Sequence, residues 1–287
     1  MNRRIIAAID GSQAGLAAAD WAARQALYRR VPLSLVHVSC AQPPREAIPV
    51  STSSPEGEVS RLISEKTHRD MIHIDLDVLT VQLAGNPRRV LLHEAADAEM
   101  LVLGSRPLTI TKGFLPGSLG LYLAAHSDRP VIIVRKPEET AAGGSARAST
   151  VVLGLDPESQ ADELVDFSFR TAQAAGASLR IVVAAAPPVF PLHHFVPVSP
   201  EERVQLESRE RPALERILKG WSEKFPELRV DAAITVGHAD EVLVDATQSA
   251  DLVVVGRRRA VGPHHLGAIA HAVLHHASCS VAVVPHD

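Results

Sequence analysis

The chain has 287 residues, of which 46% are hydrophobic and 22% charged, so it can bury a sizeable core and is not disordered. Its net charge of −4 and its 3% aromatic content argue against broad binding to nucleic acids or anionic membranes. Cys40 and Cys279 have no metal-type spacing and fit a reducing compartment. No apolar stretch is long enough to span a membrane, and the first apolar run is too short for a signal peptide, so we expect a soluble, cytoplasmic protein.

Strands and helices are expected to alternate through the first part of the chain. Apolar runs predict strands at residues 4–9, 33–38, 76–83, 101–103 and 131–134. Helical spacing and start signals predict helices at residues 13–30, 56–70, 87–98 and from 117 onward, with a Pro- and Ser-rich loop at 39–55. This alternation predicts a parallel sheet with right-handed crossovers, which is an α/β fold.

The same pattern then starts again. Asp156 follows an apolar run as Asp10 does, 146 residues earlier, and Phe167 and Arg170 repeat Trp21 and Arg24 at that distance. Residues 236–243 repeat residues 84–91, and residues 251–256 repeat residues 99–104. The chain is therefore predicted to be an internal duplication of a domain of ordinary size.

A polar segment rich in Gly, Ala and Ser separates the two copies and is typical of a linker. We place the first domain at residues 1–136, the linker at 137–148 and the second domain at 149–287.

The stretch from residue 101 to 134 combines an apolar strand, a Gly-containing loop and a helix start at Gly117-Ser118. This layout leaves backbone N–H groups pointing at one place, where an anion such as a phosphate is the natural ligand. The alternative is that Gly104 and Gly117 only make turns and that Asp10 only caps a helix.

The duplicated motifs resemble the universal stress protein family, as a tandem member. The resemblance is carried by the aspartate after the first strand, the Gly85-Asn86-Pro87 turn, and a Gly-x-x-Gly-x9-Gly-Ser motif. It implies two tandem Rossmann-like domains, each a five-stranded parallel sheet in the order 3-2-1-4-5 flanked by helices. It also implies dimer-like pairing of the two domains, often through their last strands, a possible homodimer, and binding of ATP with modest or no hydrolysis.

The family motif assigns a nucleotide site in the first domain. By resemblance Asp10 would hold the ribose or a metal ion, and Val38 would offer backbone groups to adenine. Gly117 and Ser118 would cradle phosphates. The remaining matching or flanking positions of this expected ATP site, with or without magnesium, are Gly104, Arg106, Gly113 and Leu119. The departure is Pro107, which stands where the motif has its second glycine and offers no N–H.

The second domain keeps Asp156, Gly256 and Gly267 but has Arg259 and Ala268 at the positions of the second glycine and the serine. Its loop is also two residues shorter (267 − 256 = 11, against 117 − 104 = 13). We expect a degenerate site. The alternatives are a site for another anion, formed by residues 257–259 with His264 and His265, or a solvated basic loop.

Two further features leave alternatives open. His271 and His275 are four residues apart and therefore share a helical face. They could bind a metal ion together, or they could be surface or interface histidines. The apolar segment 187–197 is a lid, a contact surface for another protein, or a packed loop.

We predict a regulatory ATP-binding protein in stress or dormancy adaptation, acting on an unknown protein partner. The alternatives are a nucleotide-independent interaction scaffold and an enzyme, at most a slow ATPase, for which no general base is visible beyond the two aspartates.

Overall fold

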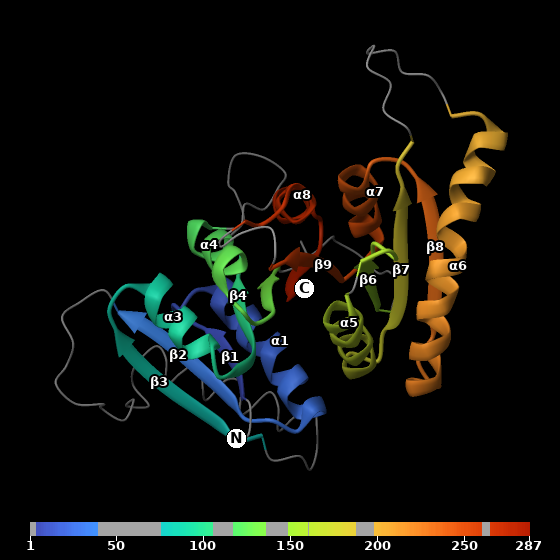
Figure 1. Ribbon diagram of the computed structural model, residues 1–287. Helices are drawn as coiled ribbons and strands as arrows, with labels where there is room; N and C mark the ends of the chain where they lie inside the picture. Colours follow the sequence, from blue (N-terminus) through green and yellow to red (C-terminus); the bar gives the residue numbers. More distant parts are fainter. Residues whose placement is uncertain are drawn as a thin grey trace, which may run out of the picture.

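The computed structural model describes residues 4–39, 76–105, 117–135, 149–159, 161–187, 198–259 and 265–287. Its centre is one ten-stranded sheet with the order β3-β2-β1-β4-β5-β10-β9-β6-β7-β8 (Figure 1). The order within the first half is 3-2-1-4-5, as predicted. The second half has the mirror-image order, so that β10 lies next to β5 and β8 forms the opposite edge of the sheet.

All strands within each half run parallel. The first half contains β1 (Arg4–Ala8), β2 (Leu33–Ser39), β3 (Val78–Ala84), β4 (Ala98–Gly104) and β5 (Val131–Val134). The second half contains β6 (Thr150–Gly154), β7 (Ser178–Ala185), β8 (Val230–Val236), β9 (Leu252–Arg258) and β10 (Ser280–His286). The central strands are apolar on both faces because helices cover both sides of a parallel sheet.

The two halves join through their last strands, as the resemblance implied. Strand β10 pairs antiparallel with β5, with Ala282 opposite Ile132 and Val281 opposite Ile133. The expectation of a parallel sheet therefore holds within each half, whereas the complete sheet is mixed.

Helices flank the sheet on both faces. Those of the first half are α1 (Gln13–Arg29), α3 (Pro87–Ala95) and α4 (Ser118–His126). Those of the second half are α5 (Asp162–Ala174), α6 (Pro200–Lys224), α7 (Ala239–Ala246) and α8 (Ala268–His276), and a 3-10 turn η1 (Thr247–Ser249) follows α7.

The buried apolar side chains form two core layers, one on each face of the sheet. Ile132 and Ala282 belong to the layer under α1, α5 and α6, and their neighbours Ile133 and Val281 belong to the layer under α3, α4, α7 and α8. Successive strand residues alternate between faces, which explains this division. Each layer contains residues from both halves, so the core continues across the joint.

Local signals in the sequence account for several helix starts. Ser12 caps α1 by accepting a hydrogen bond from the Gly15 amide, and Asn86 caps α3 ahead of Pro87. A capping box of Ser199 and Glu202 opens α6, which lies along β8 at one end of the molecule (Figure 1).

The duplication is visible in side-chain contacts as well as in the sheet. Arg24 pairs with Asp20 at 2.5 Å on α1, and Arg170 pairs with Asp166 at 2.8 Å on α5. Most predicted boundaries in the first half lie within two residues of those in the structure, and two shift by three. Helix α3 ends at Ala95 rather than 98, and β4 begins at Ala98 rather than 101, because residues 96–97 form the turn between them. The helix expected at residues 56–70, the loop at 39–55, the linker at 137–148 and most of segment 187–197 lie outside the described residues.

Candidate functional site

The sheet brings the predicted residues of the first half to one edge. Strands β2, β1 and β4 are neighbours and run parallel, so their carboxyl ends meet there. Asp10 follows β1 by two residues, Val38 lies near the end of β2, and Gly104 is the last residue of β4. This edge is therefore the candidate site.

Asp10 is exposed and is tied to the first turn of α1. Its Oδ1 accepts a hydrogen bond from the Ser12 amide at 3.1 Å and a short one from the Ser12 hydroxyl. Gly15 lies against the same carboxylate, since a Cβ added there would come within 3.1 Å of Oδ1. The turn thus holds the Asp10 carboxylate at the edge where the carboxyl ends of β2, β1 and β4 meet.

Gly104 is required by a close approach of two backbones. A Cβ at this position would lie 2.1 Å from the carbonyl oxygen of Ala14, in the first turn of α1. The glycine therefore allows α1 to pack over the end of β4, which is the turn-making role considered from the sequence.

Gly117 has the opposite surroundings. It is the N-cap of α4 with φ −57°. Among the described residues, no side chain caps the helix there and no atom lies within 4 Å of an added Cβ. Ser118 is exposed, whereas Leu119 is half-buried and packs against the core layer of that face. The first-turn amides of α4 are thus not covered by any of the described residues, and such amides favour an anion.

Val38 is half-buried and pairs with Leu83 of β3. The preceding residue, His37, was missed by the sequence reasoning: its Nδ1 lies 3.0 Å from the carbonyl oxygen of Ile9, next to Asp10. The available signal was a histidine near the end of the strand predicted at residues 33–38, which neighbours the strand that leads to Asp10. Arg106, Gly113 and Pro107 lie outside the described residues.

The equivalent edge of the second half is filled by its own side chains. Asp156 forms an ion pair with Arg258 at 2.7 Å, between Oδ2 and Nη2, and its Oδ1 accepts from the Glu158 amide. His286 lies over Gly256, where an added Cβ would come within 2.4 Å of its Nε2. Gly267 is the N-cap of α8 with φ +80°, and no atom of the described residues lies within 4 Å of an added Cβ there.

Arg259 is also paired. Its Nη1 lies 2.7 Å from Glu163 and 3.3 Å from Asp287. Partial burial acts to lower the pKa of Arg259, but the hydrogen bonds and charges of Glu163 and Asp287 outweigh it and raise that pKa. Carboxylates thus lie beside Arg258 and Arg259, whereas the side chain of Arg257 is buried.

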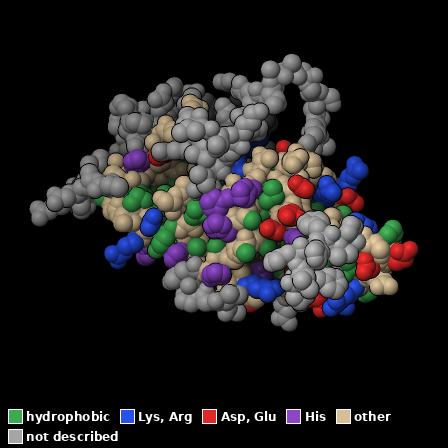
Figure 2. All heavy atoms as spheres, turned by 90° about the horizontal axis from the view of Figure 1, so that it is seen from above, with side chains coloured by type: hydrophobic (Ala, Val, Ile, Leu, Met, Phe, Trp, Pro, Cys, Tyr) green, Lys and Arg blue, Asp and Glu red, His purple; other side chains and the backbone are tan. Residues whose placement is uncertain are grey.

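The histidines of α8 form a pair on one helical face. The rings of His271 and His275 are 4.4 Å apart, and burial, followed by the charges of His271, His276 and Arg135, lowers the pKa of His275. Histidine side chains gather near the centre of the face shown in Figure 2, which looks down on the side where α8 lies. Within the described ranges no three His, Cys, Asp or Glu side chains group closely enough to hold a metal ion.

A concavity of about 550 Å³ lies at the carboxyl end of β3 and the start of α3. Its described lining residues include Gly85, Asn86 and Arg89 and none of the predicted site residues. None of the described helices is long and apolar enough to cross a membrane.

The chain is similar to known proteins over its full length. The model of the universal stress protein family matches residues 1–135 and again 148–285. Universal stress protein Rv1996 of Mycobacterium tuberculosis is 27% identical over 321 residues, covering 100% of this chain and 96% of the relative. Universal stress protein Mb2028c of Mycobacterium bovis is 28% identical over 293 residues, covering 97% of this chain and 96% of the relative.

Two solved structures share the fold over the full length. A universal stress protein from Archaeoglobus fulgidus superposes with a TM-score of 0.67 at 14% identity, with 100% of both chains covered. A structure described as a putative universal stress protein from Pseudomonas aeruginosa gives 0.65 at 17% identity, with 99% of this chain and 93% of the other covered. The two family matches, the full-length relatives and the paired halves together establish that this chain belongs to the universal stress protein family, with two such domains in tandem.

Proposed function

We propose that the protein is a regulatory adenine-nucleotide-binding protein and that ATP binds in the first half. The observation that carries this proposal is the contrast between the two edges. Gly117 and Gly267 both begin helices that no described side chain caps, so the helix starts are alike. The difference lies in the aspartates and the glycines after the fourth strands. In the second half, Asp156 is paired with Arg258 and His286 covers Gly256, whereas Asp10 in the first half accepts hydrogen bonds from Ser12 of its own turn. An edge with an exposed aspartate and open helix amides suits a ligand with a ribose and phosphates.

The proposed roles follow the positions on the edge. Asp10 would contact the ribose or a magnesium ion that accompanies the phosphates, and the backbone near Val38 would contact adenine. Gly117 and Ser118 would bind phosphate oxygens, flanked by Leu119, Gly104, Arg106 and Gly113. The second half would bind no nucleotide through Asp156, Gly256 and Gly267, because His286 and two arginine ion pairs lie where the ligand would enter.

We propose a role in signalling rather than catalysis: nucleotide occupancy would be read by a protein partner during stress or dormancy adaptation. The buried free thiol of Cys279 supports the reducing cytoplasm as the setting.

Equilibrium dialysis of the intact chain against Mg-ATP tests the proposal. We expect the wild type to bind one nucleotide per chain at submillimolar concentration. Gly117→Val combined with Ser118→Ala should abolish binding while the protein still folds, since the added side chain enters open space at an ordinary φ. Absence of binding by the folded wild type at millimolar Mg-ATP would disprove the proposed function.

A matched pair of aspartate variants locates the site. Asp10→Asn keeps an acceptor for Ser12 but removes the charge, and it should weaken binding; Asp156→Asn, at the equivalent position of the second half, should leave binding unchanged. If the Asp156 variant loses binding and the Asp10 variant does not, the nucleotide lies in the second half.

A nucleotide-independent scaffold is the second candidate, favoured by Pro107, which lacks the amide that the family glycine offers. It predicts that the purified protein releases no nucleotide on denaturation, as judged by mass spectrometry, and that its partner binding is unchanged by ATP.

A further inference from the structure

Two buried arginines cross the joint between the halves, and each reaches the carboxyl end of a helix in the other half. Arg257 Nη2 of β9 donates to the carbonyl of Ser127, the residue after α4, at 2.5 Å. Arg135 Nη2, just after β5, donates to the carbonyl of Leu274 in α8, also at 2.5 Å. The two arginines are 5% and 4% exposed.

The helix that Arg257 holds is the one that begins at the proposed phosphate position. Helix α4 has nine residues, so its two ends are only about 13 Å apart at 1.5 Å per residue. A short helix moves as a rigid unit along its axis, so a contact at Ser127 limits where the amides after Gly117 can lie. A cation at the carboxyl end also favours the helix dipole.

Arg257 itself is held at a fixed place in the second half. It belongs to β9, where it is paired with Pro285 of β10, and the next two residues form ion pairs with Asp156, Glu163 and Asp287. These contacts fill the second-half edge and anchor the end of β9. The first half adds its own contact at the same end of α4, where the Ser127 hydroxyl accepts from the Arg129 amide at 3.1 Å.

We propose that Arg257 is a positioning residue for the nucleotide site of the first half, acting across the joint through α4. The second half, whose own edge is closed by its side chains, thereby serves as the fixed support for the phosphate-binding end of the first. This inference rests on the proposed function, since it concerns the affinity of the same site.

Arg135 provides a matched control. It is equally buried, crosses the same joint in the opposite direction and donates to a helix carbonyl at the same distance, but its helix begins at Gly267 in the closed half. A substitution at either position removes one contact of the same kind between the halves. Only the Arg257 substitution should change nucleotide affinity.

The experiment measures Mg-ATP affinity and thermal unfolding of the intact chain for the wild type, Arg257→Gln, Arg257→Lys and Arg135→Gln. We expect Arg257→Gln to bind at least about fivefold more weakly, the range of a typical coupling between sites. Arg257→Lys, which keeps the charge, should recover most of the affinity, and Arg135→Gln should bind like the wild type. Wild-type affinity in Arg257→Gln, or equal weakening in Arg135→Gln, would overturn the inference.

Amide hydrogen exchange on the wild type adds a readout that needs no substitution and decides the question if Arg257→Gln does not fold. Mg-ATP should slow exchange at both ends of α4 and at residues 255–258 of β9, with α8 unchanged. Protection confined to the first half would contradict the coupling. Failure of the wild type to bind Mg-ATP would instead disprove the proposed function itself.

Discussion

At the scale of single residues, Gly104 and Gly117 of the motif differ in the space that surrounds them. Gly104 is fixed by packing, because any Cβ would overlap the Ala14 carbonyl, whereas Gly117 has free space around it. The sequence motif presents both as equivalent members of one phosphate loop. Of the two, only Gly117 has no described atom within 4 Å of an added Cβ.

Gly104→Ala should therefore destabilise the protein by about 1–3 kcal/mol or more, the cost of forcing atoms into a packed site. Gly117→Ala should cost less than about 1 kcal/mol, the loss expected at a helix N-cap. Urea unfolding of the two variants measures both values. Equal stability of Gly104→Ala and the wild type would mean that α1 does not pack over β4 as described.

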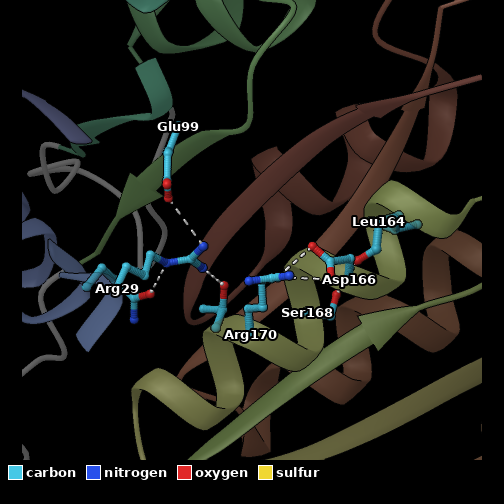
Figure 3. A network of polar contacts seen from close by, with 8 residues as sticks. Arg29, Glu99, Leu164, Asp166, Ser168 and Arg170 are labelled. Carbon is cyan, nitrogen blue, oxygen red and sulfur yellow. Dashed lines mark hydrogen bonds and ion pairs between the residues drawn. The ribbon is translucent and has the colours of Figure 1, made fainter. Parts of the chain in front are cut away.

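At the scale of elements, α1 and α5 meet across the two halves through Arg29. Its guanidinium lies 3.6 Å from Glu99 of β4 (Figure 3) and donates to the Thr171 hydroxyl at 3.0 Å. The guanidinium carbon also lies over the Phe167 ring, 5.8 Å from its centre. Burial lowers the pKa of Arg29, and the Glu99 carboxylate acts against that shift. This side chain thus connects two helices and a strand.

Replacing Arg29 by Met should cost about 1–3 kcal/mol of stability, because the buried partners lose a charged donor. Arg24→Met on the same helix is the control: its side chain is 66% exposed in the pair with Asp20, and such pairs contribute less than about 1 kcal/mol. Denaturant midpoints at constant slope compare the two. An Arg29 variant no less stable than the Arg24 variant would show that the contact between α1 and α5 contributes little.

At the scale of the whole molecule, the joint between β5 and β10 makes one body of two domains. Both core layers contain side chains from both halves, and Ile132, fully buried, lies at the joint opposite Ala282. Domains that share a core lose packing together when either one unfolds. We therefore expect the chain to unfold as one cooperative unit.

Calorimetry should show a single transition with equal calorimetric and van't Hoff enthalpies. Ile132→Ala should lower the stability of this single transition by about 2–5 kcal/mol, whereas Leu79→Ala, at a side chain 52% exposed on the outer strand β3, should change it little. Two resolved transitions, or an effect of Ile132→Ala on one half alone, would contradict a shared core.

The order of residues was sufficient to predict the described strands and helices of the first half, the duplication and, with the family resemblance, the sheet order and the pairing of the halves. These features follow from apolar periodicity, caps and turns, which are local, and from the right-handed crossover that restricts parallel sheets. The end of α3 was placed three residues too late because neither a glycine nor a proline follows Ala95 in the turn.

Which side chains lie at each edge of the sheet, in contrast, depends on contacts between residues far apart in the chain. Arg258 meets Asp156 across 102 positions, and Arg257 meets Ser127 across 130. Periodicity carries no information on which arginine of a basic run turns inward or which glycine is covered. Those outcomes depend on side-chain packing after the halves have joined, so only the tertiary structure decides which side chains meet at each edge.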